Sequence, residues 1–278
     1  MAWRDISDNP NHADVLRARQ EILTRAERDP ITDRHAHIVE LCRGRTVVDI
    51  GCVDHRASVQ ARADWLHGQI AAVASRCLGV DIEPEGVAAM VANGFPAIVH
   101  DICDDPAPLL AVGPFEVVVA GEVIEHLAAP QALFEFAAAV LAPGGILIIT
   151  TPNPYYPKRV WSGWRGATWE NADHVTYAFP GGIIEMGERA GLTLIEYRTV
   201  LIGQIGRQLK RQVLRSISRT KRRVVGPREP ATGTSTEAPT VLAFEGPGDL
   251  LAALLARSSK FRGMRSVYVL ERDAAPSA

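Results

Sequence analysis

The sequence predicts an α/β fold in which helices cover both faces of a parallel β-sheet. Short apolar strands alternate with helical segments between residues 45 and 151. The strands are continuous apolar runs, as is typical of strands buried on both faces. The chain has 278 residues, of which 47% are hydrophobic and 22% charged. This length and composition fit one large soluble unit with a sizeable core.

The elements follow in a regular order. Two helices are predicted first, over 14–29 and 31–42, and Pro30 separates them. Strands are then predicted at 46–51, 77–82, 96–101, 115–121 and 145–152. Helices are predicted between them at 57–76, 83–93 and 130–141. A long polar and aromatic loop follows at 153–179, then a helix at 181–192 and strands at 192–202 and 265–272.

Several classes of protein are excluded or disfavoured. No apolar run approaches the roughly 20 residues that span a bilayer, and the first residues lack a secretory apolar region. The cysteines form no C-x-x-C pair and lie in apolar surroundings, so we expect reduced core thiols and a cytoplasmic protein. They are Cys42, Cys52, Cys77 and Cys103.

The pattern divides the chain into three parts. We expect an N-terminal helical cap at 1–44, a main domain at 45–202 and 264–272, and an insertion at 203–263. Within the insertion, 226–240 has the composition of a flexible linker, and 248–259 reads as a short amphipathic helix.

The insertion also concentrates positive charge. Residues 207–223 contain eight basic residues and no acidic one, which leaves 22 basic against 32 acidic residues elsewhere. Apolar residues recur every four positions from Ile205 to Ile217, opposite the arginines, so an amphipathic basic helix is predicted. It is interpreted as a solvated helix, a contact for an anionic membrane surface or lipid-linked substrate, or a nucleic-acid contact. The last is disfavoured because no aromatic residues are interleaved for base stacking.

Polar or small residues follow each predicted strand. In doubly wound sheets, ligands bind outside the carboxyl ends of the strands. Gly51 lets backbone approach a ligand closely, and a carboxylate such as Asp81 can accept hydrogen bonds from both hydroxyls of a ribose. The alternative is that each aspartate only caps the next helix. The residues at these ends are Asp49–Cys52, Asp81–Glu83, Asp101–Ile102, Gly121–Glu122 and Thr150–Asn153.

The first of these turns disfavours a dinucleotide. The fingerprint G-x-G-x-x-G is missing, because Val53 and His55 would crowd a diphosphate and Asp54 would repel it. ATP is disfavoured because the chain lacks G-x-x-x-x-G-K-[ST]. A nucleoside without phosphates is the better fit.

Five motifs in this order resemble class I S-adenosylmethionine-dependent methyltransferases. They are VVDIGC, GVDIEPEG, VVVAGEVIEHL, LAPGGILIITTPNP and YVLER, and the resemblance covers about 45–200 and 264–272. It implies a Rossmann-like, doubly wound, seven-stranded and mostly parallel sheet, with the antiparallel last strand between strands five and six. It also implies that the cofactor is S-adenosyl-L-methionine.

The resemblance assigns roles at the strand ends. The methionine part of the cofactor is expected at Asp49 and Gly51, the ribose at Asp81, and the adenine at Asp101 and Ile102. Cys52, Ile82 and Glu122 are expected as further cofactor-binding residues. The family's D-x-G-x-G-x-G is incomplete here, so the loop takes another path beyond Cys52. A nucleoside-binding domain without catalysis therefore remains an alternative.

Methyl transfer to a hydroxyl needs a base, and the candidates are His126 and His174. A second interpretation is a divalent metal site, Mg²⁺ or Mn²⁺, formed by Glu122, Glu125, His126 and His174. This set resembles the Glu-x-x-Glu-His pattern and distant histidine of small-RNA 3′-terminal 2′-O-methyltransferases. Purely structural roles are the third interpretation.

The aromatic loop suggests the acceptor. Tyrosine and tryptophan rings stack on sugars or bases, or pack the loop onto the domain. TPNPYYPKRV followed by DHVTYAFP is similar to methyltransferases of bacterial polysaccharide and glycolipid gene clusters. The sequence therefore predicts methylation of a sugar hydroxyl in a glycan or glycolipid, by a cytoplasmic or membrane-peripheral enzyme. A metal-dependent RNA 2′-O-methyltransferase is the enzymatic alternative.

Overall fold

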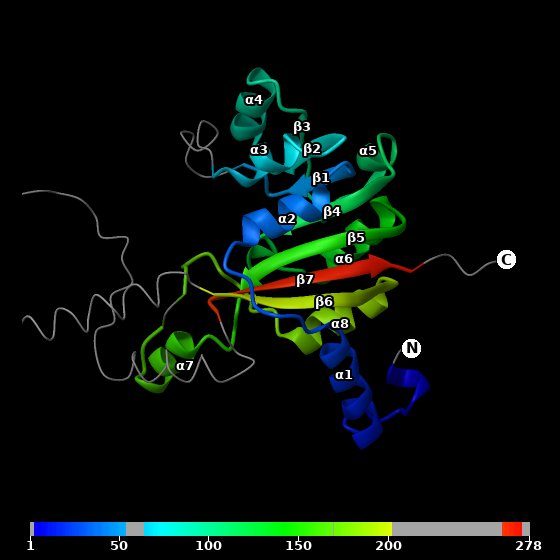
Figure 1. Ribbon diagram of the computed structural model, residues 1–278, viewed down its shortest axis with the longest axis vertical. Coiled ribbons are helices and arrows are strands. Elements are labelled where there is room, and N and C mark those ends of the chain that lie inside the picture. The colour runs from blue at the N-terminus through cyan, green and yellow to red at the C-terminus, as the bar shows by residue number, and fades with distance from the viewer. Residues whose placement is uncertain (1–2, 54–63, 169, 202–262, 274–278) are drawn as a thin grey trace, which may run out of the picture.

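Seven strands form one sheet in the computed structural model, in the order β3-β2-β1-β4-β5-β7-β6 (Figure 1). The structure describes residues 3–53, 64–168, 170–201 and 263–273. All strands run parallel except β7, which is antiparallel to both β5 and β6. The predicted mostly parallel sheet with an antiparallel last strand is thereby confirmed. The strands are β1 (Thr46–Ile50), β2 (Arg76–Asp81), β3 (Ala97–Val99), β4 (Phe115–Gly121), β5 (Leu141–Pro152), β6 (Leu192–Val200) and β7 (Arg265–Arg272).

Helices lie on both faces of this sheet (Figure 1). Local signals begin several of them: Asp33 caps α2 by accepting a hydrogen bond from the Ala36 amide, and proline opens α4, α7 and α8. The α-helices are α1 (Ala13–Ala26), α2 (Arg34–Cys42), α3 (Leu66–Ala71), α4 (Pro84–Ala92), α5 (Ala107–Leu110), α6 (Gln131–Val140), α7 (Pro157–Trp164) and α8 (Pro180–Arg189). Two 3₁₀ turns are η1 (Trp3–Asp5) and η3 (Ile124–His126).

Alternate residues of the strands build two cores, one on each face. On β1, Val48 and Ile50 join a core with Leu133 and Phe134 of α6 and Ile183 of α8. Val47 points to the other face, into a core with Ile38 of α2 and Ile70 of α3. Because side chains alternate along a strand, both faces of β1 are buried, which explains its unbroken apolar run.

Two predicted boundaries differ most from the structure. The helix predicted at 57–76 ends at Ala71 in α3, because Val73 and Ser75 make backbone hydrogen bonds with Gly44 and Arg45. Its first part lies mostly outside the described residues. The strand predicted at 145–152 begins earlier, at Leu141 in β5, where Leu141 pairs with Phe115 before the register shifts.

The predicted helical cap is closely tied to the sheet. Helix α1 packs against β6 and α8, and the residues after it form isolated bridges from Glu27 to Tyr197 and from Ile31 to Val200. The loop predicted at 153–179 contains the helix α7. The predicted basic helix at 207–223, linker at 226–240 and helix at 248–259 lie outside the described residues.

The cysteines are free thiols, three of them buried. Burial raises the pKa of Cys42 to about 12, and the same cause raises the pKa values of Cys52 and Cys77. Cys103 is exposed, so the expectation of apolar surroundings was wrong for it. It follows the short β3, in a turn held by Asp101. Across the described ranges, no helix has the length and hydropathy needed to cross a bilayer.

Candidate functional site

The carboxyl ends of β1, β2, β4 and β5 meet at one edge of the sheet. Gly51 follows β1 with a φ of +68°, and a Cβ atom there would lie 2.6 Å from Cγ2 of Val123. Glycine is therefore required both by the backbone conformation and by the close approach of the segment after β4. Cys52 continues the turn inward, with its thiol 3.6 Å from Sδ of Met90 and its carbonyl accepting a hydrogen bond from Nε1 of Trp65.

Asp49 is buried within β1 and paired with a histidine that the sequence did not single out. Oδ2 of Asp49 lies 2.9 Å from Nδ1 of His67 on α3. The other ring nitrogen, Nε2, is buried without a hydrogen-bond partner among the described residues. Trp65 and Phe95 pack around the imidazole ring. The contact with His67 therefore fixes the orientation of the Asp49 carboxylate.

Asp81 ends β2, and its carboxylate organises two turns. Oδ2 accepts a hydrogen bond from the Val53 amide at 2.9 Å, and Oδ1 accepts one from the Glu83 amide at 3.1 Å. The side chain is buried, yet Ile82 beside it is 66% exposed. Each carboxylate oxygen accepts more than one hydrogen bond, so these contacts leave capacity for ligand hydroxyls. Asp81 thus has the helix-capping contacts of the alternative interpretation and retains the chemistry of a ribose acceptor.

The third strand end is more open. Asp101 is exposed, and its Oδ1 accepts a hydrogen bond from the Cys103 amide at 2.9 Å. Ile102 turns inward and joins the core on the α6 face. The structure therefore places Asp101 at the surface of this edge and the Ile102 side chain beneath it.

Glu122 is held by two arginines that sequence reasoning missed. Its Oε1 lies 3.0 Å from an Nη of Arg34 on α2, and its Oε2 lies 2.7 Å from Nε of Arg265 at the start of β7. Arg34 also donates to Oγ1 of Thr150 at 2.9 Å, and burial lowers the pKa of Arg34. No motif marks either arginine, because the two lie 231 positions apart in sequence. The only available signal was that both flank elements predicted to reach this edge.

The backbone at Glu122 explains why it points away from the neighbouring acidic residue. Its φ is +60°, an uncommon conformation for a residue other than glycine. The 3₁₀ turn begins only afterwards, at Ile124. Glu122, Glu125 and His126 therefore do not share one helical face, as a regular helix would have required.

Glu125 lies at the centre of the site and is fully buried. Its Oε2 accepts a hydrogen bond from Oγ1 of Thr151 at 3.1 Å, while Oε1 has no hydrogen-bond partner among the described residues. Burial, followed by the negative charge of Glu122, raises the pKa of Glu125 to about 7. Its backbone carbonyl accepts hydrogen bonds from the amides of Val175 and Thr176. These two bonds join the end of the aromatic loop to the turn after β4.

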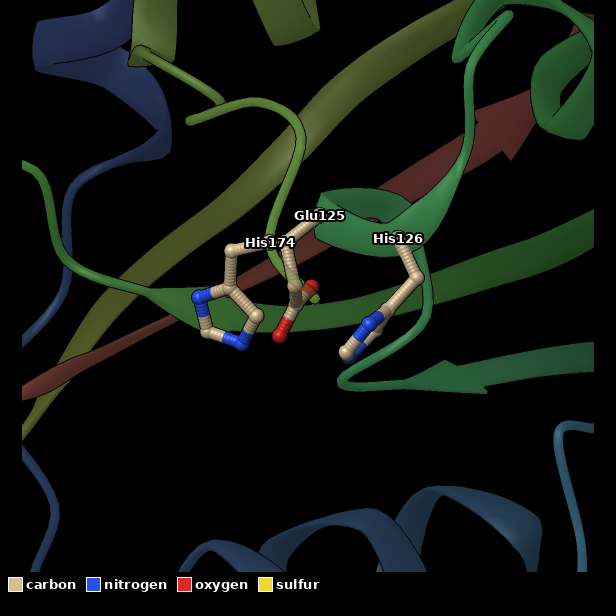
Figure 2. A group of neighbouring side chains, drawn as sticks. All are labelled: Glu125, His126 and His174. Atoms are coloured by element: carbon tan, nitrogen blue, oxygen red, sulfur yellow. The ribbon is translucent and has the colours of Figure 1, made fainter. Parts of the chain in front are cut away.

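That junction brings the two predicted histidines together. The rings of His126 and His174 meet edge to face, with centroids 4.9 Å apart, and Figure 2 shows both beside Glu125. Nδ1 of His126 lies 3.3 Å from a carboxylate oxygen of Asp173. Nε2 of His174 lies 3.3 Å from the Asn171 side chain. Burial, then the adjacent His126, lowers the pKa of His174.

The three side chains in Figure 2 could hold a cation. One ligand atom from each of Glu125, His126 and His174 lies within 4.8 Å of the other two. The unpartnered Glu125 oxygen fits such a role, because a buried carboxylate oxygen without a partner is costly. Glu122, the fourth residue predicted for a metal, is outside this group and paired with the arginines. The same three side chains also suit proton transfer, since a neutral imidazole accepts a proton.

A family model described as "Methyltransferase domain" matches residues 14–197. The match includes α1 and α2, as well as the strand ends described above. It stops before the last strand, β7.

Two curated relatives carry the name ubiquinone biosynthesis O-methyltransferase. One, from Paraburkholderia xenovorans strain LB400, is 27% identical over 125 residues, which cover 44% of this chain and 48% of the relative. The other, from Caulobacter sp. strain K31, is 49% identical over 41 residues, or 15% of this chain and 16% of the relative. The chain therefore matches about half the length of the first relative, and much less of the second.

The chain also matches solved structures at low sequence identity. One is a methyltransferase in complex with the Trm112 activator of Haloferax volcanii, at 17% identity and a TM-score of 0.48, covering 94% of this chain and 95% of that one. Another is an S-adenosylmethionine-dependent methyltransferase from Archaeoglobus fulgidus, at 13% identity and a TM-score of 0.48, covering 86% and 91%. Similarities of this size carry no information about the acceptor.

Proposed function

The chain belongs to the class I S-adenosylmethionine-dependent methyltransferases, and from that premise we propose that it O-methylates a sugar hydroxyl of a glycan or glycolipid. The observation that carries the proposal is that the side chains of His126, His174 and Glu125 lie together. They lie at the edge of the sheet that also carries the proposed cofactor-binding residues. The free thiols support a reducing compartment, and we place the reaction in the cytoplasm.

The described residues fit the cofactor. The tight turn at Gly51 admits no Cβ, the Asp81 carboxylate keeps acceptor capacity, and Ile82 leaves an apolar side chain exposed beside it. In this proposal Asp49, Gly51 and Cys52 line the methionine part. The ribose and adenine lie along the next two strand ends, at Asp81, Ile82, Asp101 and Ile102. Glu122, held by Arg34 and Arg265, borders the methionine end.

The bound cofactor supplies a methyl group on a sulfonium, so this chain's residues need only align the acceptor and take its proton. His126 is the proposed base. Its ring is partly exposed, and Asp173 lies within reach of Nδ1, which leaves Nε2 to face an acceptor. His174 packs against it and, with its pKa lowered by burial, stays neutral to contact the same hydroxyl.

The acceptor class rests on the aromatic loop and on the relatives. Rings of Tyr155 and Phe179 meet edge to face, and Tyr177 lies 6.0 Å from His174 between ring centroids. Such rings suit the apolar faces of a sugar. The names of both curated relatives specify methylation at oxygen, which supports a hydroxyl acceptor.

A metal-dependent methylation of an RNA 2′-hydroxyl is the second candidate. The unpartnered, buried oxygen of Glu125 beside two imidazoles favours it. Carboxylate and imidazole ligands suit Mn²⁺ or Mg²⁺. A bound ion would lower the pKa of the acceptor hydroxyl and replace the base.

Product labelling tests the proposal. Cell-extract fractions are incubated with the protein and S-adenosylmethionine carrying a labelled methyl group, and lipid, polysaccharide and RNA are then separated. We expect label in the polysaccharide or glycolipid fraction, released as an O-methyl sugar after acid hydrolysis. Label confined to RNA would favour the second candidate, and label in no fraction would contradict both.

Asp81→Ala is expected to weaken binding of S-adenosylhomocysteine by about 1–3 kcal/mol, because two ribose hydroxyls would lose their acceptor. Titration calorimetry measures this directly, and NAD should not bind to either protein. Asp105→Ala is the control, since Asp105 lies just before α5 and also accepts a hydrogen bond from one backbone amide, that of Ala107. An Asp81→Ala variant with unchanged affinity and a normal fold would show that the ribose is held elsewhere.

A further inference from the structure

Helix α7 leaves much of its apolar side exposed, with Val160 and Trp164 open to solvent and Trp161 half-buried. Val160, Trp161 and Trp164, with Pro157, fall within an arc of about 100° on a helical projection. Val160 is 59% exposed and Trp164 is 77% exposed, and no residue of α7 is buried. The two indole rings pack on each other, with centroids 4.8 Å apart. A surface helix of a globular domain usually buries its apolar side, so this arrangement is inverted.

The opposite side of α7 fastens it to the site. Arg159 donates to the carbonyl of Asn153 at 2.6 Å and lies over the ring of Tyr177 at 4.5 Å. Asn153 is itself buried and donates to the carbonyl of Gly263 at 3.0 Å. Helix α7 is thus held at its first turn, between β5 and the segment that carries His174. Figure 1 shows it set apart from the sheet and the other helices.

The charge around this apolar side is positive. Lys158 and Arg165 flank it, and residues 153–168 contain no acidic residue. Aromatic residues beside basic ones, on an exposed amphipathic helix, are typical of helices that lie in a membrane interface.

Charge also indicates which partner fits the apolar side of α7. The chain's own segment 207–223 also has an apolar stripe, but its eight positive charges do not complement the basic residues beside the apolar side of α7. Both segments are instead complementary to an anionic surface. We propose that α7 is an interfacial anchor that inserts Trp161 and Trp164 into an anionic lipid bilayer. The inference goes beyond the proposed function, because it is independent of the acceptor atom.

Vesicle binding tests the anchor with the full chain. Vesicles of phosphatidylcholine with roughly one third phosphatidylglycerol are compared with pure phosphatidylcholine in a sedimentation assay at low salt. We expect binding to the anionic vesicles alone. The double variant Val160→Glu/Trp164→Glu should bind at least about 10-fold more weakly, because charge replaces the inserting side chains. Val91→Glu/Leu110→Glu is the matched control, at positions 53% and 52% exposed on α4 and α5.

A second measurement reports how deeply the tryptophan side chains insert into the bilayer. Brominated phosphatidylcholine in the same anionic vesicles should quench tryptophan fluorescence of the wild-type protein. Trp161→Phe/Trp164→Phe should still bind but show much less quenching. S-Adenosylhomocysteine affinity, unchanged in every variant, verifies the fold.

Three results would overturn the anchor: wild-type protein that ignores anionic vesicles, a glutamate double variant that binds like wild type, or quenching that persists in the phenylalanine variant. Binding that disappears only when Arg207, Lys210, Arg211 and Arg215 are changed to Glu would assign the contact to the 207–223 segment instead. None of these results depends on catalysis, so the anchor and the proposed function fail separately.

Discussion

His126→Ala is expected to lower kcat about 10²–10⁴-fold for the acceptor identified by labelling, with little change in cofactor affinity. The reason is that the acceptor hydroxyl would keep its proton while it attacks the methyl group. The measurements are kcat of wild type and variant at one pH, and S-adenosylhomocysteine binding by calorimetry.

The control is His12→Asn, which replaces an exposed histidine at the start of α1 and preserves the capping acceptor. His174→Ala, assayed in parallel, separates the two imidazoles: the base is the one whose loss produces the full decrease in kcat. EDTA separates base from metal. Activity undiminished in EDTA would remove the metal candidate, and activity lost in EDTA but restored by Mn²⁺ would remove His126 as the base.

Glu125→Gln should stabilise the metal-free protein at pH 7.5 by about 2–3 kcal/mol more than at pH 5. The folded pKa of Glu125 is about 7, above the ordinary value of 4.5. As pH rises, the unfolded chain loses its proton first, so ionisation favours the unfolded state. The contribution of Glu125 to the wild-type free energy of unfolding should therefore decrease between about pH 4.5 and 7 and level off above. Glutamine cannot ionise, so the variant escapes this loss.

Urea denaturation of both proteins in EDTA, at pH 5 and pH 7.5, measures the difference. Glu135→Gln, at an exposed position of α6, is the control and should show no comparable pH dependence. If the stability difference between wild type and Glu125→Gln is the same at both pH values, Glu125 does not remain protonated in the folded protein. A cationic group would then neutralise its buried oxygen.

The sequence by itself determined the sheet and the list of candidate side chains. Strands such as 115–121 are apolar on both faces, a pattern that only a sheet covered by helices accommodates. The carboxyl ends of parallel strands share one edge, so Asp49, Asp81 and Glu122 could be predicted to lie at that edge from their places at strand ends. The last strand, 265–272, had the same bounds in prediction and structure.

Boundaries set by distant partners were not predictable in this way. Residues 72–75 have a helical pattern, yet backbone hydrogen bonds to Gly44 and Arg45 end α3 at Ala71. The 153–179 stretch has no long series of apolar residues at helical spacing, and no residue of its helix α7 is buried. Hydrophobic periodicity reports burial, so a helix without a buried side gives a weak signal.

Only the tertiary structure decided which candidates act together. Glu122 and Glu125 are three residues apart, but a positive φ at Glu122 directs its carboxylate to Arg34 and Arg265, from opposite ends of the chain. Glu125 instead meets His174, because its carbonyl holds the Val175 and Thr176 amides. Side-chain chemistry is local and can be read along the chain. Which side chains contact one another depends on backbone conformation and on contacts between segments far apart in sequence. The spacing of residues along the chain does not encode either.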